Sequence, residues 1–166
     1  MAVGFARLET PVGALWLFAM DGALAGLAFE DRRAALKSHL NRRFGGQVIE
    51  EVEDPAGAVS RLAAYFTGDL EAIDAIRVDP GGTPFQRAVW SALRRIPAGR
   101  TVAYSELASL SGHPRAVRAV DLANARNPIA IVVPCHRVIG ADGSLTGYGG
   151  GLERKAWLLS HEHVLL

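Results

Sequence analysis

The sequence predicts a two-part α/β chain, with a small sheet-and-helix domain at residues 1–79 and a mainly helical domain at residues 80–166. Short apolar segments separated by turn signals fill the first 30 residues, which is typical of neighbouring strands. From residue 83 onward, apolar side chains recur at helical spacing instead. Asp79-Pro80-Gly81-Gly82 lies between the two patterns and has the composition of a linker. A chain of 166 residues is long enough to bury a substantial core.

The first part contains turn and stop signals but no recognisable chemical motif. Asp21-Gly22 is a strong hairpin signal, and Gly45-Gly46 ends an amphipathic helix. The apolar residues Ala35, Leu36, Leu40 and Phe44 lie near one face of that helix. The predicted elements are strand, strand, strand, helix, strand, helix and strand, at residues 5–8, 14–18, 23–29, 31–44, 48–52, 56–66 and 72–78.

The second part opens with a well-defined helix start. Thr83 is the predicted cap, Pro84 occupies the first turn and Gln86 completes a capping box. Four apolar residues then follow at helical spacing and are predicted to face the core: Phe85, Val89, Leu93 and Ile96.

Two shorter helices are predicted next, at residues 105–110 and 115–126, joined by a turn that contains Gly112 and Pro114. This order is typical of a helix-turn-helix. Val117, Val120 and Ala123 form an apolar stripe on the second helix. Its other side carries Arg115, Arg118 and Arg126, with the small Ala119 between them. The alternative is an ordinary solvated surface helix.

The charge balance favours a polyanion as the partner of the second part only. Residues 1–79 hold 8 Lys and Arg against 12 Asp and Glu, a balance of −4. Residues 80–166 hold 10 against 5, a balance of +5. An acidic half joined to a basic half indicates that the second half meets nucleic acid, although solvated surface alone can show a similar imbalance.

Cys135 is the only cysteine and lies between Pro134 and His136. The β-branched run at residues 129–133 predicts a short buried strand that Pro134 stops, which holds the thiol at the end of a rigid element. A thiol of ordinary pKa, about 8.5, needs a neighbouring base or cation to react at neutral pH. The two interpretations are a nucleophile paired with His136 and an inert buried cysteine.

A single cysteine excludes an intramolecular disulfide, and with five scattered histidines it does not supply the ligand set of a structural zinc site. We therefore expect no metal. Neither a signal peptide nor a membrane-spanning apolar run is evident, so a cytoplasmic location is expected.

The segment Pro134-Cys135-His136-Arg137-Val138-Ile139-Gly140 resembles the active-site signature of the O6-alkylguanine-DNA alkyltransferases. The resemblance covers residues 80–162, with several motifs in the family's order and spacing, and is looser before residue 80, chiefly at residues 62–68. The other similar segments are Thr83-Pro84-Phe85-Gln86, Ile96-Pro97-Ala98-Gly99, residues 101–108, Arg118-Ala119-Val120, Asn127-Pro128 and residues 146–151.

The resemblance implies a ribonuclease-H-like first domain and a second domain with a winged-helix-like helix-turn-helix. It also implies an activity: a single, irreversible transfer of the alkyl group from O6-alkylguanine, and from O4-alkylthymine, in double-stranded DNA to Cys135. The helix at residues 115–126 would enter the minor groove, and the damaged base would be flipped out of the stack. No cofactor is implied. The expected state is a monomer, with clustering of several molecules on DNA as an alternative.

The resemblance also implies roles for individual residues near the thiol. Glu162 would orient His136, which would take the proton of Cys135 through a water. Asn127 would tie the recognition helix to the active-site strand, and Tyr104 would help rotate the phosphate and donate to guanine N3. From the pattern alone, Glu162 reads as a solvated residue, Asn127 as a turn residue and Tyr104 as a domain-surface residue.

The remaining implied contacts concern DNA and the guanine pocket. Arg118 would fill the gap left by the extruded nucleotide, with Arg115, Ala119 and Arg126 along the same helix against DNA. Tyr148, Gly149, Gly150 and the carbonyl of Val138 would line the pocket. Three successive glycines also suit a simple flexible loop.

One position of the recognition helix departs from the family pattern. Asp121 stands where the family usually has glycine, and Leu122 follows it. Asp121 could weaken binding to phosphates or pair with Arg118 at i, i+3 spacing.

Three other classes of function are alternatives to alkyl transfer. A non-catalytic sensor of alkylated bases would lack the cysteine. A multiple-turnover cysteine hydrolase would regenerate Cys135, and a transcription regulator would prefer one DNA sequence.

Overall fold

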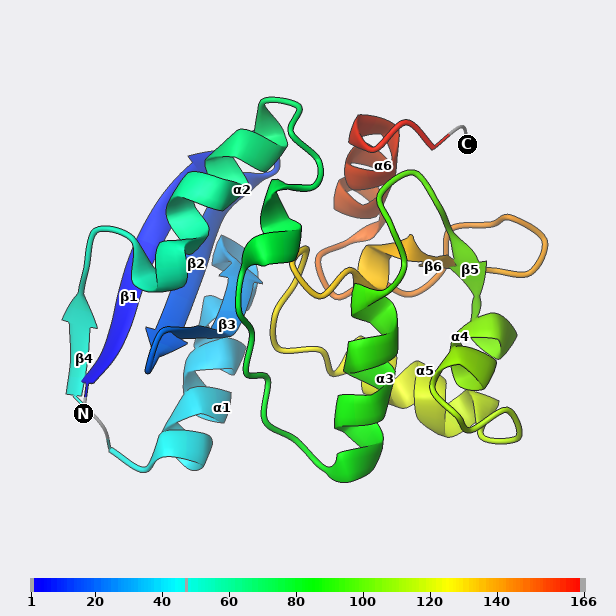
Figure 1. Cartoon of the computed structure of the whole chain (residues 1–166), viewed down its shortest axis with the longest axis horizontal. Helices are drawn as coiled ribbons and strands as arrows, with labels where there is room; N and C mark the ends of the chain where they lie inside the picture. Colours follow the sequence, from blue (N-terminus) through cyan, green and yellow to red (C-terminus); the bar gives the residue numbers. More distant parts are fainter. Residues whose placement is uncertain (1, 47, 165–166) are drawn as a thin grey trace. The chain divides into compact units, whose positions relative to one another are not determined.

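The computed structural model describes residues 2–46 and 48–164, which form two compact units (Figure 1). The first unit comprises the chain up to Gly81 together with Pro128–Val132, and the second comprises Gly82–Asn127 and the chain from Val133 onward. The predicted α/β fold class is confirmed. Residues 128–132 belong to the first unit, whereas the sequence predicts them in the helical part.

The first unit is built on a four-stranded sheet of order β3-β2-β1-β4. Strands β1 and β2 pair antiparallel, as do β2 and β3, whereas β4 is parallel to β1. Asp21 and Gly22 between β2 and β3 both have positive φ, as the predicted tight hairpin turn requires. The strands span Ala2–Thr10 (β1), Gly13–Met20 (β2), Ala23–Phe29 (β3) and Val48–Glu51 (β4).

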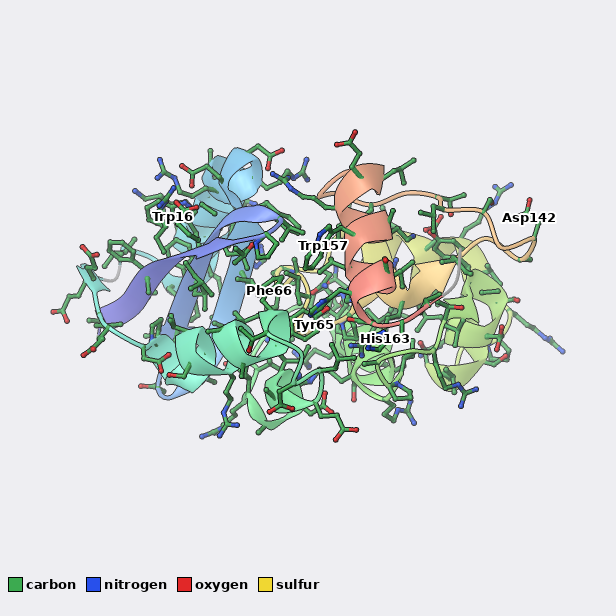
Figure 2. All side chains as sticks on the ribbon, turned by 90° about the horizontal axis from the view of Figure 1, so that it is seen from above. Trp16, Tyr65, Phe66, Asp142, Trp157 and His163 are labelled. Atoms are coloured by element: carbon green, nitrogen blue, oxygen red, sulfur yellow. The ribbon has the colours of Figure 1, made fainter. Side chains whose placement is uncertain are left out.

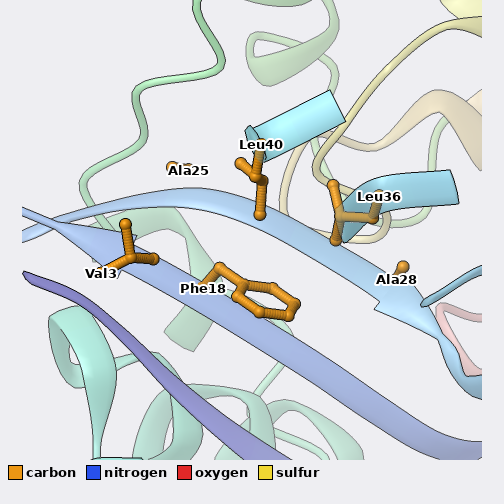
Figure 3. Packing of buried hydrophobic residues seen from close by; sticks show 6 residues of the cluster. All are labelled: Val3, Phe18, Ala25, Ala28, Leu36 and Leu40. Atoms are coloured by element: carbon orange, nitrogen blue, oxygen red, sulfur yellow. The ribbon is translucent and has the colours of Figure 1, made fainter. Parts of the chain in front are cut away.

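Two helices pack on this sheet. Helix α1 (Arg33–Phe44) follows a short 3-10 turn, η1 (Glu30–Arg32), and ends at Gly45 in the left-handed conformation, as predicted. Leu36 and Leu40 of α1 are buried against four residues of the sheet (Figure 3). Of the predicted apolar face, Phe44 is half-buried and Ala35 is exposed. The sheet residues of this cluster are Val3, Phe18, Ala25 and Ala28.

Helix α2 (Ala58–Phe66) follows a second 3-10 turn, η2 (Pro55–Gly57). Tyr65 near its end is fully buried and meets the ring of Phe66 edge-on, with the centroids 5.1 Å apart (Figure 2).

The strand predicted at residues 72–78 is wrong. A 3-10 helix, η3 (Ala72–Ala75), occupies its first half, and only Val78 forms a single bridge, to Leu24. The buried residues are Ile73 and Ile76. Their spacing of three fits a helical turn rather than the alternation of a strand.

The strand predicted at residues 129–133 is also wrong, although the predicted burial is correct. Only Ile129 bridges to a strand residue, Leu27, and the chain then turns, with Ile131 at φ +68°. Pro128 and Pro134 bracket the segment and cannot donate to a ladder, so there is little room for regular pairing.

The second unit contains four helices and a two-stranded parallel pair, β5 with β6, in its described residues. Its first helix, α3, has the predicted capping box between Thr83 and Gln86. Trp90, which the sequence analysis did not single out, donates from Nε1 to the Ala123 carbonyl at 2.8 Å and so joins α3 to α5. The elements are α3 (Pro84–Arg94), β5 (Val102–Ala103), α4 (Tyr104–Leu110), α5 (Val117–Ala125), η4 (Cys135–Arg137), β6 (Val138–Ile139) and α6 (Leu152–His161).

Of the apolar residues predicted to face the core from α3, three are buried: Val89, Leu93 and Ile96. Phe85 is half-buried, with its ring against that of His113. Helices α4 and α5 pack on each other and are joined by residues 111–116 (Figure 1). Helix α5 begins two residues later than predicted, because Arg115 and Ala116 still belong to the turn.

Candidate active site

Cys135 opens a single 3-10 turn held between a buried loop and a strand. Its amide donates to the Val133 carbonyl at 2.8 Å, and the amide of Arg137 donates to the Pro134 carbonyl at 3.0 Å. The chain then enters β6, where Val138 pairs with Val102. Cys135 is buried, with 9% of the residue exposed.

Asn127 links α5 to the cysteine segment. It lies two residues beyond the end of α5, and its Nδ2 donates to the Val133 carbonyl at 2.7 Å. Its side chain also forms a hydrogen bond that lowers the pKa of Cys135. The structure therefore brings the Asn127 side chain next to Cys135.

His136 and Glu162 form a buried hydrogen-bonded pair, with 2.7 Å between Nε2 and Oε2. Arg137, for which no role was predicted, binds the same carboxylate through two nitrogens. Its Nε is 2.8 Å from Oε1 and its Nη2 is 3.0 Å from Oε2. The third guanidinium nitrogen, Nη1, donates to the Ile96 carbonyl at 2.6 Å. All three side chains are buried, so the pattern-only reading of Glu162 as a solvated residue does not hold.

The charges of this cluster fix the tautomer of His136. Burial raises the pKa of Glu162, but the interactions with His136 and Arg137 outweigh it and hold the pKa of the carboxyl well below its usual range. Burial lowers the pKa of His136, and the attraction of Glu162 only partly opposes this. The imidazole is therefore neutral and donates from Nε2 to an anionic Glu162. Its buried Nδ1 makes no hydrogen bond within the described part of the chain and is left as the proton acceptor.

Lys155 is a second residue near the thiol that sequence reasoning missed. It is buried on α6, and its Nζ donates to the carbonyls of Val138 and Thr146, both at 2.6 Å. Burial raises the pKa of Cys135, while the Asn127 hydrogen bond and the Lys155 charge lower it. At rest, Cys135 is thus a protonated thiol with a cation nearby that favours the thiolate.

A sequence signal for these charges was present. Lys155 and Glu162 fall on the same stripe of α6 as the buried Leu158 and Leu159. Charged residues at the apolar positions of an amphipathic helix indicate buried, paired groups rather than solvated ones.

The glycine-rich loop contacts the start of α4. The Tyr104 hydroxyl lies 3.2 Å from Thr146 Oγ1, and the Thr146 carbonyl accepts from Lys155. Of the predicted pocket residues, Val138 is bound through its carbonyl to Lys155. Tyr148 and Gly150 are half-buried on the loop, and Gly149 is exposed.

Helix α5 and the turn before it present a basic face to solvent. Four of the side chains predicted to meet DNA are exposed, Arg115, Arg118, Ala119 and Arg126, whereas the fifth, Tyr104 on α4, is half-buried. Val120 and Ala123 are buried on the opposite side, and Val117 is half-buried. Asp121 is exposed but forms no ion pair with Arg118 in the described structure, which corrects the pairing suggested above. Burial lowers the pKa of Lys155, and the charge of Asp121 partly opposes this shift.

Within residues 2–46 and 48–164, no cluster of three or more His, Cys, Asp or Glu side chains could hold a metal ion. In the same ranges, every helix is too short or too polar to cross a bilayer.

Comparison with known proteins decides the family. The ribonuclease-like domain of 6-O-methylguanine DNA methyltransferase matches residues 4–80, and the DNA binding domain of the same protein matches residues 84–164. A Salmonella typhimurium methylated-DNA–protein-cysteine methyltransferase is 47% identical over 163 residues, which cover 96% of this chain and 95% of that protein. The chain belongs to the 6-O-methylguanine DNA methyltransferase family.

Other members of the methyltransferase family are similar over nearly the whole chain. The Methanosarcina barkeri methyltransferase is 46% identical, covering 93% of this chain and 94% of its own. Mycobacterium tuberculosis OGT, solved in complex with DNA, is 41% identical with a TM-score of 0.77, covering 98% of this chain and 92% of that one. The Pyrococcus kodakaraensis O6-methylguanine-DNA methyltransferase is 27% identical with a TM-score of 0.75, covering 98% and 99%. These matches confirm the resemblance found in the sequence.

Proposed function

We propose that this methyltransferase repairs DNA by direct reversal. It takes the alkyl group from O6-alkylguanine, and from O4-alkylthymine, in duplex DNA onto Sγ of Cys135, once per molecule. The observation that carries the proposal is a single buried thiol that has a hydrogen bond to Asn127 and the charge of Lys155 nearby, and that is followed in the chain by a histidine held by the Glu162 carboxylate. Full-length relatives are named for methyl transfer to a protein cysteine.

The reaction is a displacement at a saturated carbon. The proton of Cys135 passes to Nδ1 of His136, through a bridging water in the family arrangement, while Glu162 stabilises the resulting imidazolium. The sulfur–carbon bond forms as the bond from the alkyl carbon to guanine O6 breaks. Tyr104 donates to guanine N3, so the leaving base does not carry a full negative charge.

The product is a thioether, which has no easy hydrolytic exit, so the protein acts once. Every step uses groups of the protein and the base, and the reaction needs no cofactor.

Guanine O6 inside a duplex is out of reach, so the base must leave the stack. Helices α4 and α5 act as a helix-turn-helix, with α5 in the minor groove and Arg118 filling the gap left by the flipped nucleotide. Arg115 and Arg126 contact phosphates, and the small Ala119 allows close approach. All four residues are exposed on one basic face, which supports this assignment.

The protein is proposed to act as a monomer, because all the transfer residues come from one chain, with clustering on DNA as an alternative. A lone reactive thiol suits the reducing cytoplasm.

Intact-protein mass spectrometry tests the proposal. After incubation with excess O6-methylguanine duplex, the protein should gain the mass of one methyl group, and the gain should map to the Cys135 peptide. A base sensor would gain nothing, and a cysteine hydrolase would release product repeatedly without a lasting gain. Either result would overturn the assignment.

The rate of transfer is expected to rise with pH through the neutral range. Burial raises the pKa of Cys135. Below that pKa, the thiolate fraction grows about tenfold per pH unit. The check is a single-turnover rate between pH 6 and pH 9 at saturating duplex and fixed salt. A rate that is flat or falls with pH would show that thiol ionisation does not limit transfer.

Arg118→Ala should slow transfer from duplex DNA at least about tenfold. Unstacking a base costs a few kcal/mol, and Arg118 offsets part of that cost by filling the gap in the stack. Reaction with a free O6-alkylguanine base should suffer much less, because no base has to be extruded. Arg100→Ala, which removes an exposed arginine outside α5, is the control for lost charge. An equal loss of transfer rate by Arg118→Ala on both substrates would contradict the proposal that Arg118 fills the gap left by the flipped nucleotide.

A further inference from the structure

Leu122 is a large apolar side chain exposed in the middle of the basic face of α5. It is 51% exposed. Arg118 lies one turn before it and Arg126 one turn after it, both exposed on the same side of the helix. An apolar side chain thus stands between two arginines on the face proposed to meet DNA.

The fold does not use Leu122 as a core residue. The buried residues of α5 are Val120, Ala123 and Asn124, and they lie on the other side of the helix. Alanine has the higher helix propensity, so the helix itself gains nothing from a leucine here. The side chain is therefore available to a partner.

Charge selects the partner. The exposed face around Leu122 carries Arg118 and Arg126, Arg115 is exposed in the turn before α5, and Asp121 does not neutralise Arg118 by an ion pair in the described structure. A cationic face with one central apolar side chain matches the minor groove, whose phosphates attract arginine and whose sugars and base edges accept apolar wedges.

We propose that Leu122 is an apolar wedge that packs into the minor groove against the sugars and the base step beside the flipped nucleotide. This inference rests on the proposed function, because it places α5 in the groove. Arg118 then fills the space of the lost base, while Leu122 holds the groove open one helical turn further along. The bulk of Leu122 is thereby a contact rather than an obstacle to close approach.

The test compares three variants by their affinity for O6-methylguanine duplex across a salt series. Leu122→Ala should bind about five- to tenfold more weakly, the loss expected when an apolar contact is truncated. Leu122→Met keeps apolar reach and should stay within about twofold of wild type. The matched control is Leu110→Ala, which truncates a leucine 43% exposed at the end of α4 and should also stay within about twofold.

The salt dependence separates a wedge from a charge effect. Leu122→Ala should leave the slope of log affinity against log salt unchanged, whereas Arg126→Ala, which removes a proposed phosphate contact, should make it shallower by about one. The ratio of transfer from duplex to transfer from the free base should fall with Leu122→Ala. Thermal melting checks that each variant folds.

The wedge is overturned if Leu122→Ala binds duplex as tightly as wild type, if Leu110→Ala loses as much, or if the salt slope changes. Duplex affinity answers this question whether or not the methyl group is transferred. If wild-type Cys135 gains no methyl group, the proposed function fails separately.

Discussion

Cys135→Ala is expected to abolish methyl transfer while leaving duplex binding within about twofold of wild type. Cys135 carries the only thiol in the chain. It lies in the turn η4, outside the proposed DNA-binding helix α5. Its removal deletes the acceptor of the alkyl group without touching the basic face. Single-turnover transfer from O6-methylguanine duplex measures the first effect, and equilibrium duplex binding measures the second.

Cys135→Ser is the sharper companion variant. It keeps a polar atom that Asn127 can bond, but a hydroxyl is a far weaker nucleophile than a thiolate. Its transfer rate should fall by at least about a thousandfold, because the loss of an activated nucleophile can cost about a millionfold. Methyl transfer by Cys135→Ala to any other residue would refute Cys135 as the acceptor.

Much of the architecture could be predicted because it depends on local signals. The turn at Asp21-Gly22, the stop at Gly45 and the cap at Thr83 each follow from the backbone freedom or hydrogen-bonding capacity of one or two residues. The two wrong strands, at residues 72–78 and 129–133, had strand-like composition. Composition reports burial well, but pairing depends on which chain lies alongside.

The site could be predicted in part, and the missing part has a common cause. Cys135 and His136 are adjacent in sequence, so both could be singled out from the sequence as candidate site residues. Arg137 and Lys155 act through contacts to Glu162, Ile96, Val138 and Thr146, which are distant along the chain. Their roles depend on tertiary contacts; the apolar stripe of α6 signals that Lys155 is buried, but not which carbonyls it binds.

Glu162→Gln is expected to have the second largest effect, on both stability and rate. Glutamine keeps an acceptor for His136 but leaves the buried guanidinium of Arg137 without a countercharge, which typically costs about 3–5 kcal/mol. It also removes the charge that stabilises the imidazolium, so transfer should slow by about 100-fold or more. Glu153→Gln removes an exposed carboxylate from the first turn of the same helix and should change stability by less than about 0.5 kcal/mol.

The pH dependence of stability separates the charge of Glu162 from its shape. Its pKa is lower in the folded protein than in the unfolded chain. The stability it contributes is therefore fully present above the unfolded value, about 4.3, and is lost as pH falls toward the folded value. Denaturant unfolding at pH 7 and at pH 3.5 should show the difference in stability between wild type and Glu162→Gln narrowing at the lower pH by about 1 kcal/mol, while Glu153→Gln follows wild type at both. A constant difference between wild type and Glu162→Gln would mean that packing, rather than the buried charge, accounts for the role of Glu162.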